Sequence, residues 1–216
     1  MTKKSVILLF LFLSISELWA SSVMQYPLQQ AEKASFEKKI VEWIKKPVIR
    51  GQFKQTKSIP KLNRNFISNG TFLIASDKGL ILNVQKPFIS TMIITREMII
   101  QKNASGKKET LKAKDTPSFI HFSEMMISLF SKKPENLYTH FSVFFNMNNQ
   151  SWDLGLVPKD PSVRSVILSI ELSGENDFPH KMILNNADGS KTQYDFFDAA
   201  FFSSLNSEET GLFDGR

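Results

Sequence analysis

The sequence predicts an α+β fold, in which an antiparallel, strongly curved sheet of about ten or eleven strands carries two helices across it. Short segments rich in β-branched and aromatic residues recur along almost the whole chain. Turns of hairpin length separate most of these segments, which favours antiparallel pairing of neighbours. Two longer segments show helical spacing of their apolar residues instead.

The first predicted helix covers residues 28–46 and is stopped by Pro47. The second covers residues 117–130, with Thr116 as its cap and Pro117 at its first position. One side of this second helix is unusually bulky; its residues are Phe119, Phe122, Met125, Met126, Leu129 and Phe130. The opposite side is expected to carry His121, Ser123, Glu124 and Ser128.

The remaining apolar segments are expected to be strands. Their ranges are 48–57, 67–75, 80–84, 89–95, 98–102, 109–113, 141–147, 151–157, 165–172, 181–185 and 191–196. Residues 158–161 are interpreted as a break between two strands. The residues after Asp198 are expected to form a loosely held tail.

Several of these strands are apolar on both faces. Phe72 and Ile74 alternate with Leu73 and Ala75, and the next strand shows the same pattern. An antiparallel sheet with one wet face would alternate apolar and polar residues. Both faces must therefore be largely covered, or one must line an interior space.

Residues 1–20 are typical of a secretory signal peptide, because Lys3 and Lys4 precede an apolar run over 6–15 and a small residue, Ala20, ends the segment. Cleavage is expected after Ala20, with a cut one or two residues later and an uncleaved anchor as alternatives.

Removing two Lys and one Glu from a chain of charge +6 leaves a mature charge of +5. An exported basic protein favours anionic lipid surfaces or acidic partners, and nucleic acid is not expected as a partner. The basic residues are scattered in pairs, which favours an ordinary solvated surface.

Several chemistries lack their sequence signatures. The chain has no Cys, which excludes disulfides, thiol catalysis and lipidation of an N-terminal cysteine. No nucleophile elbow, phosphate loop or paired zinc-binding histidines are present. His121, His140 and His180 are far apart in sequence, so no metal site, cofactor or catalytic residue is predicted.

Three groups of residues together resemble a known family. They are Gly51-Gln52-Phe53-Lys54-Gln55-Thr56, then Ser68-Asn69-Gly70-Thr71-Phe72, then Lys86-Pro87-Phe88 leading into Thr91-Met92-Ile93-Ile94-Thr95. Late in the chain, Trp152-Asp153-Leu154-Gly155-Leu156-Val157-Pro158 and Asp188-Gly189-Ser190-Lys191-Thr192 add to the pattern. Over residues 32–197 the sequence resembles the periplasmic outer-membrane lipoprotein carriers, the LolA-like family.

The resemblance implies a half-closed antiparallel β-barrel lidded by helices, whose concave apolar face holds the acyl chains of a cargo. The candidate lipid-binding residues are Phe53, Phe72, Ile74, Leu80, Leu82, Met92, Ile94, Phe119, Phe122 and Met126. If these residues line a concave face, the interior should hold an apolar pocket of several hundred Å³ or more, a rough figure for ligand sites. Ser76-Asp77-Lys78-Gly79 stands where the family usually carries a basic turn with a latching Arg. The lid is therefore expected to be held by apolar packing of Phe119, Phe122 and Met126.

The resemblance also implies the partners. These are a lipid-modified protein or other acylated cargo, an inner-membrane loading machine and an outer-membrane acceptor, with the carrier itself a periplasmic monomer and one domain over residues 21–216. Lipoprotein cargo is favoured over a glycolipid or a lipid-linked pigment. Two alternatives stay open: a non-carrier envelope sensor or structural module on the same fold, and an exported hydrolase.

Overall fold

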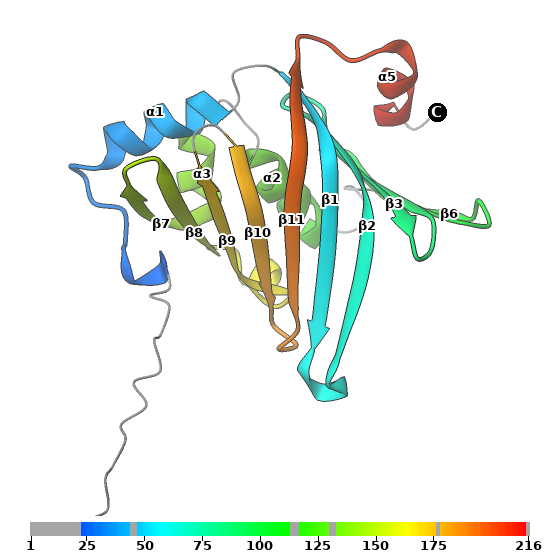
Figure 1. The fold of residues 1–216 in the computed structure, drawn as a ribbon, viewed down its shortest axis with the longest axis horizontal. Coiled ribbons are helices and arrows are strands. Elements are labelled where there is room, and N and C mark those ends of the chain that lie inside the picture. Colours follow the sequence, from blue (N-terminus) through cyan, green and yellow to red (C-terminus); the bar gives the residue numbers. More distant parts are fainter. Residues whose placement is uncertain (1–22, 44–46, 113–116, 130–132, 176–177, 215–216) are drawn as a thin grey trace, which may run out of the picture.

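The structure is a computed structural model that describes residues 23–43, 47–112, 117–129, 133–175 and 178–214 (Figure 1). The predicted signal peptide and the predicted cap Thr116 lie outside these residues.

The described chain folds into eleven strands with short helices before, between and after them. The strands are β1 (Val48–Ile59), β2 (Arg64–Ala75), β3 (Gly79–Lys86), β4 (Ser90–Ile94), β5 (Met98–Asn103), β6 (Lys108–Lys112), β7 (Phe141–Asn148), β8 (Ser151–Pro158), β9 (Ile167–Glu175), β10 (Phe178–Asn186) and β11 (Lys191–Phe202). The helices are η1 (Val23–Gln25), α1 (Lys33–Trp43), η2 (Pro60–Leu62), α2 (Pro117–Ser128), α3 (Glu135–His140), α4 (Pro161–Arg164) and α5 (Ser207–Phe213).

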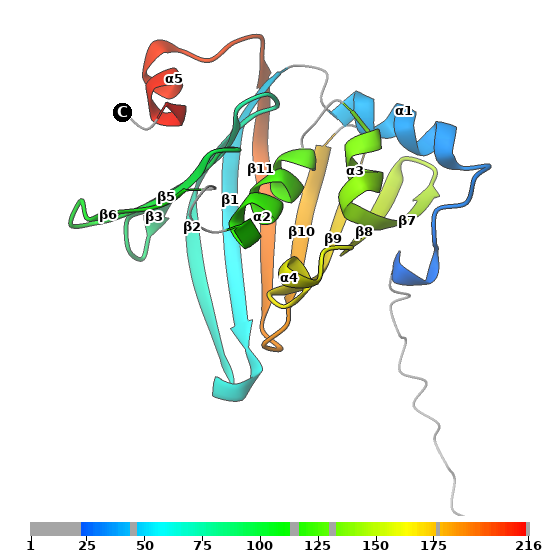
Figure 2. The ribbon, with the colours of Figure 1, turned by 180° about the vertical axis from the view of Figure 1, so that it is seen from behind.

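All eleven strands belong to one antiparallel sheet, in the order β6-β5-β4-β3-β2-β1-β11-β10-β9-β8-β7. Two meanders, β1 to β6 and β7 to β11, are joined side by side where β1 pairs with β11. The sheet is not closed, since β6 and β7 lie at its opposite edges. Helices α2 and α3 lie across one face of the sheet (Figure 2). The predicted fold class is therefore confirmed.

The two faces of the sheet carry separate hydrophobic cores, as the two-faced strands predict. The inner core lies under α1, α2 and α3 and includes Phe72, Ile74 and Leu80. The outer core contains the alternate residues Leu73, Ala75 and Ile81, packed against Phe213 of α5. Because neighbouring strand residues point to opposite faces, each apolar strand is covered twice.

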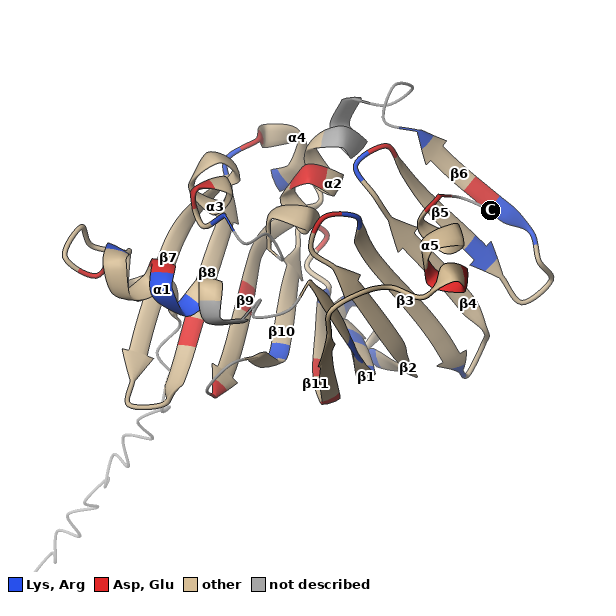
Figure 3. Cartoon of the chain, turned by 90° about the horizontal axis from the view of Figure 1, so that it is seen from above, with Lys and Arg blue, Asp and Glu red and all other residues tan. Residues whose placement is uncertain are grey.

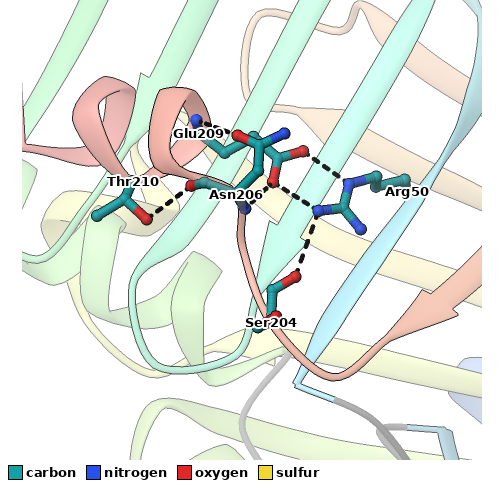
Figure 4. A network of polar contacts seen from close by, with 5 residues as sticks. All are labelled: Arg50, Ser204, Asn206, Glu209 and Thr210. Atoms are coloured by element: carbon teal, nitrogen blue, oxygen red, sulfur yellow. Dashed lines mark hydrogen bonds and ion pairs between the residues drawn. The ribbon is translucent and has the colours of Figure 1, made fainter.

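The expected loose tail after Asp198 is wrong. Strand β11 continues to Phe202, and α5 follows with a capping box, in which the Asn206 side chain accepts from the Glu209 amide and the Glu209 carboxylate accepts from the Asn206 amide. Arg50 of β1 donates to the same carboxylate from Nε at 2.7 Å and from Nη2 at 2.5 Å (Figure 4). The C-terminal helix is thus fixed to the outer face by a bidentate ion pair as well as by apolar packing.

The first helix begins later than predicted. Leu28, the first residue of the predicted helix, is extended instead and lies with Tyr26 along the edge of β7. The Leu28 amide donates to the Val143 carbonyl, and the Phe145 amide donates to the Tyr26 carbonyl. These bonds satisfy backbone groups of an edge strand, which explains why this segment is extended. Helix α3 was not predicted. Helix α4 was not predicted either; it begins at Pro161, the last residue of the expected break at 158–161, and runs to Arg164.

Two glycines of the family-like motifs make room for a neighbouring group. A Cβ on Gly51 would lie 2.6 Å from the ring of Phe72, its partner on β2. A Cβ on Gly70 would lie 1.9 Å from the Asn83 carbonyl oxygen, at a bulge between β2 and β3. The glycine at 51 therefore leaves the space that an aromatic ring of the inner face occupies.

Charged residues are spread over many elements of the sheet and helices (Figure 3). Both signs occur on β6, the strand at one free edge. Charged side chains on an edge strand oppose pairing with another chain.

Candidate functional site

An apolar cavity of about 190 Å³ lies between the inner face of the sheet and α2. Strands β2, β3, β4, β10 and β11 form its wall, and α2 covers it. Its lining residues are Phe72, Ile74, Leu80, Leu82, Met92, Ile94, Phe122, Met126, Met182, Leu184, Tyr194 and Phe196. Among these, the Tyr194 hydroxyl is the one polar side-chain group.

The cavity brings together eight of the ten candidate residues. From the sheet these are Phe72, Ile74, Leu80, Leu82, Met92 and Ile94, and from α2 they are Phe122 and Met126. Phe53 is buried beside them but lines an adjoining groove instead. Phe119 lies in α2, and its side chain is outside the part of the chain that the structure describes.

Four cavity residues were not predicted: Met182 and Leu184 of β10, and Tyr194 and Phe196 of β11. Within each pair the residues are two apart, so they share one face of a strand. That alternation is visible in the sequence. These residues reach the cavity, however, only because β11 pairs with β1, which lies about 140 residues away in the chain.

The cavity is smaller than the several hundred Å³ that were expected. Phe122 and Met126 descend from α2 onto the sheet and occupy part of the space. From below, the Phe72 ring packs edge-on against Phe196, with ring centroids 5.3 Å apart. We expected an open concave face, but side chains of α2 fill much of the space above it.

A groove of about 150 Å³ adjoins the cavity and shares Leu82, Met92 and Tyr194 with it. Its polar residues include Gln55, whose Nε2 donates to the Tyr194 hydroxyl oxygen at 2.8 Å. Burial raises the pKa of Tyr194, so its hydroxyl stays neutral at ordinary pH. The lining of the inner face is thus apolar beneath α2 and partly polar in the groove.

Helix α2 is held over the cavity by packing and by one polar link. Met125, Met126 and Leu129 are buried against the sheet. His121 Nδ1 lies 2.7 Å from Asp160 Oδ2, in the turn before α4. The expected apolar packing of Phe122 and Met126 is present. The expectation that no hydrogen-bonded latch holds the lid is wrong, because His121, on the outer side of the helix, reaches a carboxylate that is distant in sequence.

Asp160 also caps α4, accepting from the amides of Ser162 and Val163. The Ser162 hydroxyl, the Val163 amide and the nearby His121 hold the pKa of Asp160 down at about 2. The carboxylate is thus ionised at any physiological pH and available to His121.

Two serines expected on the outer side of α2, Ser123 and Ser128, are instead buried, and the Ser128 hydroxyl donates to the Met125 carbonyl at 2.6 Å.

Two further hollows lie at the surface, outside this cavity. One, of about 390 Å³, includes Gln29, Lys33 and Lys159 in its lining. The other, of about 440 Å³, includes His121, Glu124 and Asp160. Both are larger than the apolar cavity, but their charged linings are unsuited to hydrocarbon.

Within the described residues, no three His, Asp or Glu side chains gather as they would around a metal ion. Over the same ranges, no helix has both the length and the apolar character needed to cross a bilayer.

Comparison with known proteins gives one family. Residues 45–208 match the model of the outer membrane lipoprotein carrier protein LolA. No curated protein sequence matches the chain significantly.

Solved structures with a similar fold share little sequence with it. A LolA superfamily protein from Nitrosomonas europaea is 11% identical, with a TM-score of 0.45, over 81% of this chain and 95% of the other. An outer membrane lipoprotein-sorting protein domain from Vibrio parahaemolyticus is 9% identical, with a TM-score of 0.46, over 89% and 99%. The MucA/MucB complex from Pseudomonas aeruginosa matches at 12% identity and a TM-score of 0.44, over 82% and 59%.

The family model spans the sheet from before β1 to the first turn of α5, and so includes every strand that forms the cavity. The protein therefore belongs to the family of the outer membrane lipoprotein carrier protein LolA.

Proposed function

We propose that the protein is a periplasmic carrier that binds the acyl chains of a lipoprotein or related lipid in the cavity beneath α2 and shuttles them toward the outer membrane. The observation that carries this proposal is the apolar cavity itself, enclosed between five strands and a lid helix. The family match adds support, because the family is that of a lipoprotein carrier.

The cavity must widen to hold a long chain. An apolar cavity of about 150 Å³ holds a molecule the size of benzene. The 190 Å³ beneath α2 therefore suits a small part of an acyl chain. Displacement of Phe122 and Met126 would open the rest of the concave face, so we infer that these two side chains move when cargo binds.

Energetics imply partners at both ends of the route. Each buried methylene contributes about 0.8 kcal/mol, so one 16-carbon chain represents on the order of 12 kcal/mol out of water. A soluble protein does not extract such cargo from a bilayer unaided. An energised inner-membrane machine would load the carrier, and an outer-membrane acceptor would offer the chains equal burial.

A non-carrier sensor or structural module on the same fold is the second candidate. The small volume of the cavity favours it, since a packed inner face needs no ligand to be stable. This candidate predicts no acyl binding at all.

Substituting Leu82 by Glu separates the two candidates. Leu82 is half-buried and lines both the cavity and the adjoining groove. A carboxylate there would face the lipid tail without a partner and should weaken binding of a fluorescent fatty acid by about tenfold or more. The matched control is Leu168→Glu on β9, because Leu168 is half exposed and lies outside the cavity lining.

Probe displacement and thermal unfolding are measured together on the wild type and both variants. The carrier is supported if Leu82→Glu stays folded and loses the probe, while Leu168→Glu binds normally. A wild type that binds no probe, or a folded Leu82→Glu protein with unchanged affinity, contradicts the proposal and favours the second candidate.

A further inference from the structure

Large apolar side chains are exposed at the ends of two hairpins, β1–β2 and β3–β4. Leu62, Phe66 and Ile67, at the end of the β1–β2 hairpin, are 58%, 48% and 50% exposed. Phe88 and Ile89, in the β3–β4 turn, are 80% and 64% exposed. We refer to residues 57–69 and 84–92 as the hairpin tips.

The two tips lie at the same end of the sheet. Strands β1 and β3 run in the same direction, because both pair antiparallel with β2. The pairing of β2 with β3 ends at Asn69 and Lys86, which brings the start of the second tip beside the first. The β1–β2 hairpin extends beyond this point and projects from the body of the sheet (Figure 1).

The formal charge within the two tips is entirely positive. Beside the first tip, the β10–β11 turn adds one acidic residue, Asp188, whose pKa is lowered by hydrogen bonds from Ser190 and by the nearby charges of Lys57 and Lys61. Lys57, Lys61, Arg64 and Lys86 fall within them, and neither range contains an Asp or Glu. The opposite end of the same strands carries both signs, since Asp77 and Lys78 share the β2–β3 turn and Arg96 and Glu97 share the β4–β5 turn. The charge asymmetry therefore follows the position of the exposed apolar residues.

We propose that the hairpin tips are a docking surface for an anionic phospholipid bilayer. Apolar side chains that protrude separately from turns can each enter the boundary between headgroups and acyl chains. Basic residues beside them are attracted to anionic lipid, and each contributes roughly a fivefold gain in affinity. A protein partner would need a shaped surface matched to these projections, whereas a fluid bilayer needs none.

The tips are also connected to the inner face. Along β2, the alternate residues Phe66, Gly70, Phe72 and Ile74 point to one side of the sheet. The last two line the cavity, and Val84 of the second tip lines the adjoining groove. Docking through the tips would therefore place this groove close to the lipid surface.

This surface is independent of acyl binding in the cavity, so it goes beyond the proposed function. The test is flotation of the full mature chain with vesicles of phosphatidylethanolamine and phosphatidylglycerol, compared with vesicles of pure phosphatidylcholine. The wild type should float with the anionic vesicles, and raised salt should weaken its binding.

Two tip variants probe the apolar and charged contributions separately. The double substitution Phe88→Ser with Ile89→Ser removes the most exposed apolar pair, and Lys61→Glu with Arg64→Glu reverses two charges. Each should lower vesicle binding by at least about tenfold. The control, Val41→Ser with Met147→Ser, replaces residues of 47% and 48% exposure on α1 and β7 and should leave binding unchanged.

Circular dichroism and thermal unfolding show whether each variant is folded, and the two tip variants serve as independent tests. Leu82→Glu, which targets the cavity, should still float with vesicles. The proposal is overturned if the wild type does not bind anionic vesicles, or if folded tip variants bind them as well as the control does. Failure of fatty-acid binding with vesicle binding intact would count against the carrier and leave the docking surface standing.

Discussion

Arg50 on β1 donates two hydrogen bonds to the carboxylate of Glu209 on α5, across 159 residues of sequence. The Arg50 guanidinium also lies over the ring of Phe202, 4.1 Å from its centroid. Glu209 in turn caps α5 through the Asn206 amide. One carboxylate thus stabilises the helix and fixes it to the outer face of the sheet.

Replacing Glu209 with Ala should destabilise the protein by about 2–3 kcal/mol, because it removes a bidentate charge-assisted pair and half of a capping box. Glu208→Ala, an exposed neighbour in the same helical turn, should change stability by less than about 0.5 kcal/mol. Chemical denaturation measures both, and hydrogen exchange over residues 207–213 shows whether α5 detaches. Equal effects of the two variants would contradict the role given to Glu209.

The same pair predicts a pH dependence. Hydrogen bonds from Arg50 lower the pKa of Glu209 below its ordinary value of 4.5. A carboxyl group whose folded pKa is lowered contributes full stability above its unfolded pKa and loses it as the pH falls through the folded value. Wild-type stability should therefore decline below pH 4.5, and Glu209→Gln should decline less steeply over that range. Parallel pH profiles for the two proteins would contradict this.

Alanine substitutions at Phe122 and Phe36 compare a residue that lines the cavity with a residue of the packed core. Phe36 is fully buried and packs edge-on against Phe145, whereas Phe122 is half-buried and lines the cavity. Phe36→Ala should cost about 3–5 kcal/mol, as in a packed core, and Phe122→Ala only about 1–2 kcal/mol. Urea denaturation decides this, and a cost for Phe122→Ala as large as that for Phe36→Ala would show that the site is packed core.

Gly51 sets the position of the Phe72 ring. A methyl group at 51 would lie 2.6 Å from that ring and push it into the cavity. Gly51→Ala should therefore weaken fatty-acid binding several-fold, while Gly211→Ala, with open space around its Cβ, should not. Probe titration of both variants measures the difference. Unchanged binding by a folded Gly51→Ala protein would exclude Phe72 from the binding wall.

His121 links the lid helix to the turn before α4. If this link holds α2 down, His121→Ala should bind a fluorescent fatty acid several-fold faster in stopped-flow mixing, because the lid opens more often. His180→Ala, an exposed histidine on β10, is the control. Identical association rates for both variants would show that the link does not limit opening.

The sequence predicts the sheet well because strands are local patterns. Alternation and turn residues place the strands within a few positions, except that β11 runs past its expected end at 196 to Phe202. The two-faced strand containing Leu73 and Ile74 requires cover on both sides. The contacts that cover the outer face are not local. Helix α5 is only seven residues long, and its attachment depends on Arg50, far away in sequence. The Asn206-x-x-Glu209 spacing before Leu212 and Phe213 is a capping-box pattern that marks its start.

The lining of the cavity could likewise be predicted only where it follows from local sequence patterns. Residues of β2, β3 and β4 follow from alternation along consecutive hairpins. The contributions of β10 and β11 require the long-range pairing of β1 with β11. The link from His121 to Asp160 depends on where helix α2 meets the turn before α4, and the small cavity volume depends on how far the Phe122 and Met126 side chains reach toward the sheet.

Photo-crosslinking with a diazirine fatty acid, followed by peptide mass spectrometry, would show where a bound acyl chain lies in the protein. Labelling should map to β2, β3, β4, β10, β11 and α2, which line the cavity, and unlabelled palmitate should compete with it. Labelling concentrated around Leu28, Tyr138 and Phe141, which line the hollow of about 390 Å³, would contradict the carrier proposal, as would labelling that palmitate does not reduce.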